Sequence, residues 1–146
     1  MFEVGLIQFL KNNTGIAALV SGRVFAGRIP KNADAATYPC IVWTVASTMD
    51  NPIISGTSGF RMKRVQLDCY DRINRVNETG HSYVANVRVA DAVRSAFQTF
   101  LHGTFPDGTK VDSCVIISDQ DFPDEPGDSG QLFRRMIEVQ IAYQES

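Results

Sequence analysis

Acidic side chains are the densest group in this sequence that could do chemistry. Five of them fall within a short stretch near the C-terminal end: Asp119, Asp121, Asp124, Glu125 and Asp128. Closely spaced oxygen ligands are what a calcium ion requires, but in a calcium-binding loop of the EF-hand type Pro123 would occupy the third ligand position, and no loop glycine follows it. We therefore interpret Asp121, Asp124, Glu125 and Asp128 as a solvated or partner-docking segment, with a bound cation as the alternative.

Three other patterns do not meet the geometric requirements of known chemistry. Gly103–Lys110 resembles a phosphate-binding loop, but its lysine comes one position late and the segment leads from a helix to a strand. His81 and His102 flank a predicted helix and lie too far apart to share a metal ion. No serine or cysteine has the neighbours that nucleophilic catalysis requires. The sequence thus predicts no catalytic residue, no cofactor and no metal ligand, and we do not expect an enzyme.

Length and composition place the chain among ordinary globular proteins. It has 146 residues, a net charge of −2, 44% apolar residues and 21% charged residues. These values suit one domain over residues 1–146 and exclude binding to DNA or anionic lipid through bulk charge. The sequence contains neither a signal-peptide pattern nor an apolar stretch long enough to cross a membrane. Cys40, Cys69 and Cys114 lie in apolar runs, so we expect buried free thiols in a protein made in a reducing cytoplasm.

A strand at residues 60–70 is predicted to organise the fold. Its apolar residues Val65, Leu67 and Cys69 alternate with polar ones, which is typical of a strand with one buried face. A helix over Tyr83–Leu101 is predicted to cover that face. Its apolar stripe consists of Val87, Ala90, Val93, Phe97, Phe100 and Leu101.

The remaining elements follow from the same periodicities. Apolar residues at helical spacing between Phe2 and Leu10 predict an opening helix, and Thr14 is expected to cap a second helical turn over Ile16–Val20. Further strands are predicted at Val24–Ile29, Cys40–Ala46, Val111–Ile117 and residues 132–143. This order predicts an α+β fold with a mostly antiparallel β-sheet and helices packed on one face.

Two segments between these elements are predicted to be long loops. Ser47–Gly59 is rich in glycine, proline, serine and threonine, and Asp119–Gly130 is rich in acid, proline and glycine. The first carries Pro52, Ile53 and Ile54 at its centre. Because an apolar tip among polar neighbours is unfavourable in water, we expect these three residues to dock a partner. The alternative is that the two isoleucines fold back onto the chain's own sheet.

Basic residues gather around two of the predicted strands. They are Arg61, Lys63, Arg64, Arg72, Arg75, Arg134 and Arg135. Most are expected to form exposed ion pairs across the sheet with acids such as Asp68 and Glu138. A phosphate-facing patch is the alternative.

Several phrases, in this order along the chain, resemble the tail completion, or tail terminator, proteins of bacteriophages with long tails. The phrases are Gly15–Pro30, Tyr38–Trp43, Arg64–Tyr70, Ala90–Arg94 and Phe133–Tyr143. Each phrase belongs to a strand or helix rather than to a catalytic motif. The resemblance therefore implies an architecture and a place in the virion, without a set of active residues.

The resemblance implies a non-enzymatic, hexameric ring of identical subunits that caps the tail tube. Its expected partners are other copies of itself, the tail tube protein and a head-closure or neck protein, with double-stranded DNA passing through the ring and no membrane contact. The protein would be found in the virion, and in the host cytoplasm during assembly. The alternatives are another phage neck or minor tail component of similar fold, and a small cytoplasmic enzyme.

Overall fold

The computed structural model describes residues 1–31, 37–53, 56–72, 81–127 and 130–144. The helices in this part of the chain are α1 (Phe2–Asn12), α2 (Thr14–Val20) and α3 (His81–Phe100). The strands are β1 (Val24–Ala26), β2 (Cys40–Ile53), β3 (Gly56–Arg72), β4 (Gly103–Thr104), β5 (Lys110–Gly127) and β6 (Gly130–Gln144).

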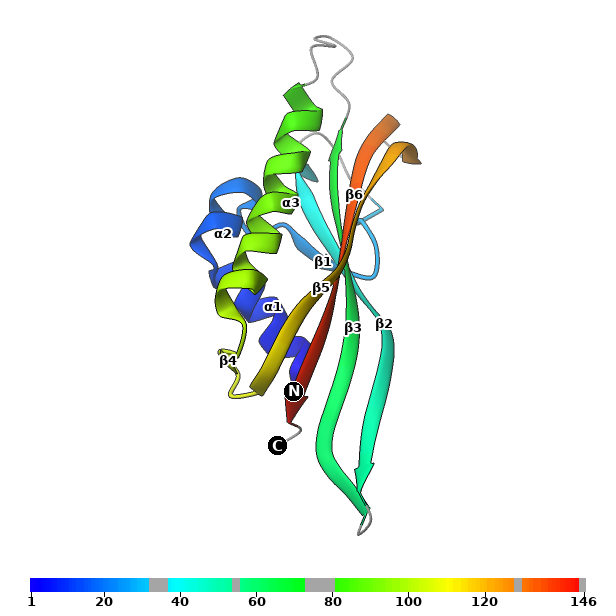
Figure 1. The fold of residues 1–146 in the computed structure, drawn as a ribbon. Coiled ribbons are helices and arrows are strands. Elements are labelled where there is room, and N and C mark those ends of the chain that lie inside the picture. Colours follow the sequence, from blue (N-terminus) through cyan, green and yellow to red (C-terminus); the bar gives the residue numbers. More distant parts are fainter. Residues whose placement is uncertain (32–36, 54–55, 73–80, 128–129, 145–146) are drawn as a thin grey trace.

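The strands form one six-stranded sheet in the order β1-β2-β3-β6-β5-β4. Only the short β1 runs parallel to its neighbour, and the other pairs are antiparallel. All three helices lie on the same face of the sheet (Figure 1). The predicted α+β fold, with a mostly antiparallel sheet covered on one face, is therefore confirmed.

The core lies between the helices and the strands β3 and β6. Val65, Leu67 and Cys69 are fully buried, which confirms the predicted inward face of the organising strand. The closing strand contributes its alternate residues Ile137, Val139, Ile141 and Tyr143. The helix α3 contributes Val89, Ala90, Val93, Ala96 and Phe97.

The predicted stripe of α3 was wrong at its C-terminal end. Leu101 is 54% exposed, because it follows the helix in a left-handed conformation with φ of 53° that turns its side chain away from the core. Val87 is only half-buried, whereas Val89, which was not assigned to the stripe, is 1% exposed. The short strand β4 that follows was not predicted.

Local capping corrects two boundaries near the N-terminus. The cap of α2 is Asn13 rather than Thr14, because the Asn13 side chain accepts a hydrogen bond of 3.1 Å from the backbone N–H of Ile16. The strand β1 ends at Ala26 instead of Ile29, since Gly27 follows with a φ of +79° that leaves the extended conformation.

Both predicted long loops are instead paired strands. Residues 47–53 and 56–59 belong to a β2–β3 hairpin, because β2 continues to Ile53 and β3 begins at Gly56. Residues 119–127 and 130 belong to a β5–β6 hairpin in which β5 continues to Gly127. Prolines and bulges interrupt the alternation in both, and they are tolerated there because β2 and β5 lie near the sheet edges. The two hairpins project towards opposite ends of the molecule (Figure 1).

A second, smaller apolar cluster lies on the other face of the sheet. It consists of Tyr38, Cys40 and Leu132, with Phe25, Ile29 and Tyr70 packed against it. Ile29 and Tyr38, which lie between β1 and β2 in the sequence, thus cover one end of the face that carries no helix. The three cysteines are free and buried, as predicted.

Candidate assembly surfaces

The β2–β3 hairpin is the first candidate surface. Register shifts interrupt its ladder between Val45 and Ser47 and again between Asp50 and Pro52. Pro52 and Ile53, two of the predicted docking residues, belong to β2, while Ile54 lies outside the described residues. Met49 on the same strand is 66% exposed. The hairpin extends beyond the last pair of β3 with β6, Phe60 with Gln144, and so projects from the sheet as a two-stranded arm.

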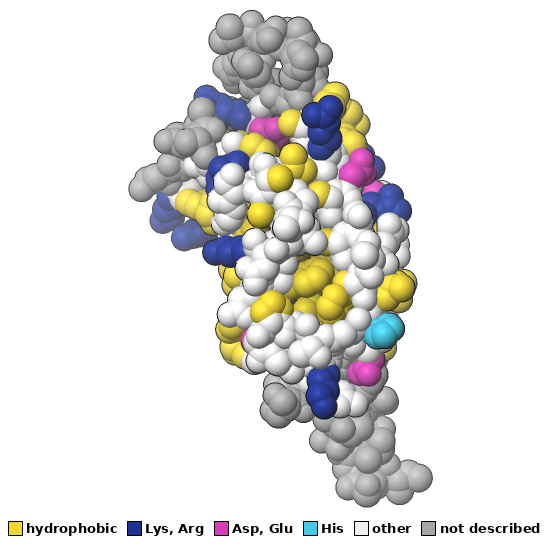
Figure 2. Space-filling model, turned by 90° about the vertical axis from the view of Figure 1, so that its left-hand side faces the viewer, with side chains coloured by type: hydrophobic (Ala, Val, Ile, Leu, Met, Phe, Trp, Pro, Cys, Tyr) yellow, Lys and Arg dark blue, Asp and Glu magenta, His cyan; other side chains and the backbone are white. Residues whose placement is uncertain are grey.

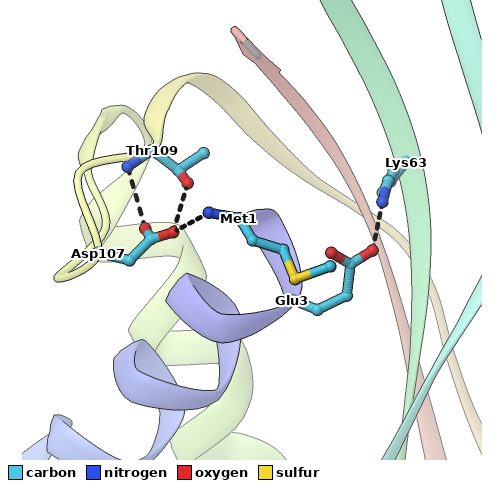
Figure 3. Close-up of polar contacts among 5 residues, drawn as sticks. All are labelled: Met1, Glu3, Lys63, Asp107 and Thr109. Atoms are coloured by element: carbon cyan, nitrogen blue, oxygen red, sulfur yellow. Dashed lines mark hydrogen bonds and ion pairs between the residues drawn. The ribbon is translucent and has the colours of Figure 1, made fainter. Parts of the chain in front are cut away.

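An ion pair fastens the root of this arm to α1. Lys63 of β3 is 8% exposed and binds the carboxylate of Glu3 (Figure 3). Its ammonium group also lies 5.0 Å from the ring centroid of Phe2. Burial alone would lower the pKa of Lys63, but the hydrogen bonds and charges of Glu3 and Tyr143 together outweigh burial and raise that pKa. Burial would raise the pKa of Glu3, but the hydrogen bond and charge of Lys63, a backbone hydrogen bond and the terminal amino group together lower it.

The start of α1 is held by the turn between β4 and β5. The terminal amino group of Met1 lies 2.8 Å from Oδ2 of Asp107, which also accepts a hydrogen bond from the hydroxyl group of Thr109 (Figure 3). Oδ1 of Asp107 accepts a hydrogen bond from the backbone N–H of Thr109. A Cβ atom on Gly5 would lie 2.2 Å from Oδ1 of Asp107, so only glycine allows this close approach. These contacts therefore constrain the position of α1 closely.

The β5–β6 hairpin carries the second candidate surface. Asp119 accepts hydrogen bonds from Arg94 of α3 at 3.0 Å and from Arg135 of β6 at 2.9 Å. Asp121 accepts a hydrogen bond of 2.7 Å from the hydroxyl group of Tyr83, which raises the pKa of Tyr83. These contacts join α3 to the hairpin. They give Asp119 a structural role and leave Asp121 exposed.

The predicted acidic cluster is thus only partly brought together. Asp124 and Glu125 belong to β5, and Asp128 lies outside the described residues. Within the described ranges, no group of three or more His, Cys, Asp or Glu side chains is placed to hold a metal ion.

The sheet face opposite the helices carries two of the predicted ion pairs, although the Asp68 side chain is buried rather than exposed. Arg64 lies 2.9 Å from Glu138, and Arg134 lies 3.0 Å from Asp68. The guanidinium group of Arg134 also stacks at 4.5 Å over the ring of Phe122. These arginines have carboxylate partners within the chain, which argues against the phosphate-facing patch.

The three buried thiols are poorly suited to nucleophilic catalysis or metal binding. Burial raises the pKa of Cys40 and of Cys114 to about 12 and also raises that of Cys69. A thiol that stays protonated at neutral pH is a poor nucleophile and a poor metal ligand. The cysteines therefore act as small apolar residues of the core.

Sequence reasoning missed exposed apolar residues on β5 and on α3. Val115 is 56% exposed and Ile117 is 41% exposed on β5, and Tyr83 and Val84 are exposed on α3. A register shift between Ile116 and Ser118 breaks the strand's alternation, so the pattern of apolar residues did not distinguish inward from outward positions. The apolar residues that follow one another from Val115 to Ile117 were the signal available in the sequence.

The described residues thus form an elongated sheet with one helical layer and two projecting hairpins. The family model of tail completion protein gp17 matches residues 4–144. The chain belongs to this family, which consists of structural tail proteins of phage virions. The resemblance noted from the sequence is therefore confirmed.

A solved structure supports the fold independently. The chain is similar to a chain in the virion of a native gene transfer agent particle, with 15% sequence identity and a TM-score of 0.64. The match covers 99% of this chain and 94% of that one. A comparison with curated protein sequences gives no match. No helix in the described part of the chain is long and apolar enough to span a membrane.

Proposed function

We propose that the protein acts without catalysis, as a single unit over residues 1–146, in a homohexameric ring that caps the phage tail tube. The ring stops tube elongation and joins the tail to the neck of the filled head, and double-stranded DNA passes through it. The observation that carries this proposal is membership of the tail completion family across residues 4–144. Assembly takes place in the host cytoplasm, and the ring stays in the virion.

The shape of the subunit supports two-sided docking. The β2–β3 arm and the β5–β6 hairpin point in opposite directions along the strands (Figure 1). A subunit that joins a tube to a neck needs one surface for each partner, and projecting hairpins provide such surfaces at both ends. In this proposal, Pro52, Ile53 and Ile54 dock one axial partner, while Asp124, Glu125 and Asp128 dock the other.

The internal pairing of the arginines supports passage of DNA without tight binding. Arg64 and Arg134 are neutralised by carboxylates of the same sheet face. Binding to DNA depends on phosphate neutralisation by unpaired basic groups, so a channel that releases DNA should present few of them.

Phage that lacks this gene, supplied with the protein from a plasmid, tests the proposal. Electron microscopy of lysates should show joined particles with tails of uniform length when the protein is supplied. Without it, we expect unjoined heads and tails of irregular length. Normal particles in the absence of the protein would contradict the proposed function.

A further inference from the structure

The two edges of the sheet differ in charge and in apolar exposure. On one side, the basic flank is defined by Arg23 at the start of β1 and by Arg28 and Lys31 after β1; the latter two are exposed. Dark-blue side chains gather on this side of the molecule, along the left edge of Figure 2. On the other side, the acidic flank is defined by Val115, Ile117 and Asp121 of β5, all of them exposed.

The outer edge of β5 is open to pairing. Its pairs with β4 involve only Lys110 and Val111, and within the described residues no strand lies against the rest of that edge. On the other side of the sheet, β1 pairs with β2 only as far as Trp43, and in the part of the chain that the structure describes no strand covers the β2 edge from Thr44 onward. Open edges with exposed apolar side chains are sites at which strands of another chain add.

The charged parts of the two flanks lie at the same level along the strands. One row of paired residues crosses the sheet and contains Val24, Ile41, Cys69, Arg135 and Asp121. Asp121 therefore lies at the same level as Val24, which directly follows Arg23. In the same way, Ile117 of the acidic flank lies between the rows of Thr44 and Val45, where the β2 edge becomes open.

In a closed ring, two surfaces can meet between neighbouring subunits only if they lie at the same level, as the two flanks do. Neighbouring subunits of a closed ring are related by rotation without translation along the axis, so two contacting patches must lie at the same height. In a ring whose axis follows the strands, Asp121 of one copy would face Arg23 and Arg28 of the next. In that arrangement, β5 of one copy runs antiparallel to β1 and β2 of the next copy. Antiparallel pairing also joins β2 to β3, β3 to β6 and β6 to β5 within the subunit.

We propose that the ring closes through contact of the acidic flank of one copy with the basic flank of the next copy. Asp121 pairs with the basic side chains, and Val115 and Ile117 pack beside the open edge of β2. This inference rests on the proposed ring and names the surfaces that form it. Its salt dependence follows from the exposure of the charged groups.

Charge reversal on each flank separately, and then on both, tests the contact. The variant Arg28→Glu/Lys31→Glu reverses the basic flank, and Asp121→Lys reverses the acidic flank. Tyr83→Phe removes the hydrogen bond to Asp121 without a change in charge, and Lys110→Glu reverses a charge at the far end of β5. Purified tails from phage without the gene are incubated with each variant at low salt, and rings on the tail ends are counted by electron microscopy.

Each single-flank reversal should weaken ring formation by about ten-fold or more, because like charges then face each other in every contact. The variant with both flanks reversed should recover, and both controls should assemble like the original protein. Thermal unfolding checks that each variant folds. If the original protein forms rings and the reversals do not affect them, this inference is wrong while the proposed function stands. If the original protein forms no ring, the proposed function itself fails.

Discussion

At the scale of single residues, the Lys63–Glu3 pair is the contact whose loss should be most costly at the root of the arm. Lys63 is almost entirely buried, and Glu3 is about one-third exposed. Glu3→Ala should therefore lower the free energy of unfolding by about 1–3 kcal/mol, because a buried ammonium group loses its charged partner. Urea unfolding measures the change. Glu3→Gln keeps an acceptor and should cost less; equal stability of the original protein and Glu3→Ala would show that Lys63 finds compensation elsewhere.

A second residue-scale prediction concerns Asp71, which is 8% exposed. Burial raises its pKa from 3.8 to about 6, although the backbone N–H of Arg72 and the charge of Arg23 oppose the shift. The folded state therefore binds more protons than the unfolded state between about pH 4 and pH 6, and stability falls as pH rises through this window.

Asp71→Asn should remove this loss. We expect the free energy of unfolding at pH 7 to rise by up to about 3 kcal/mol, and the gain to vanish below about pH 4. Urea unfolding across this pH range provides the measurement, with the exposed Asp112→Asn as the matched control. A variant that is less stable than the original protein at neutral pH would show that the Asp71 carboxylate has a stabilising role.

At the scale of elements, the packing of α3 on the sheet has a direct test at Phe97. This residue is 1% exposed and its ring centroid lies 5.1 Å from that of Phe9. Phe97→Ala should cost about 3–5 kcal/mol, because it leaves a cavity between α3 and the sheet. Phe100→Ala, at a half-buried position on the same helix, should cost less. An unchanged melting temperature of Phe97→Ala would contradict the described core.

The β2–β3 arm carries the second prediction at this scale. Ile53→Ser/Ile54→Ser should leave the thermal stability of the isolated protein nearly unchanged while tails fail to join heads. The reason is that the proposed partner, rather than the chain's own core, buries the two isoleucines. Their burial would contribute roughly 3–6 kcal/mol to docking, before the entropy lost on ordering the arm is subtracted. Calorimetry and microscopy of lysates give the two readings. A loss of several kcal/mol of folding stability would instead assign the arm to the core.

The sequence predicted the interior of this fold better than its edges. Val65, Leu67 and Cys69 alternate cleanly because β3 is paired on both sides and covered by helices on one face. In the hairpins, by contrast, proline and bulges shift the alternation, so paired strands resembled loops. The ion pairs of Asp68 and Glu138 could be predicted because they are close across adjacent strands. The contact of Asp119 with Arg94 could not, since it depends on how α3 packs on β5.

At the scale of the whole molecule, family membership and the two opposed hairpins together support a subunit that works only in an assembly. A closed ring needs two different surfaces that fit head to tail. The pure protein should therefore associate weakly and form a ring only on the tail end. Mass photometry of the purified protein checks the first part, and a tight dimer in solution that persists on tails would contradict it.

The most direct measurement of the central claim is electron cryomicroscopy of complete tails with the position and copy number of this protein resolved. The account predicts one closed ring of six copies at the head-proximal end of the tube, with the β2–β3 arms and the β5–β6 hairpins directed to opposite axial partners. A protein found along the length of the tube, at its distal tip, or as an isolated dimer at the neck would contradict it.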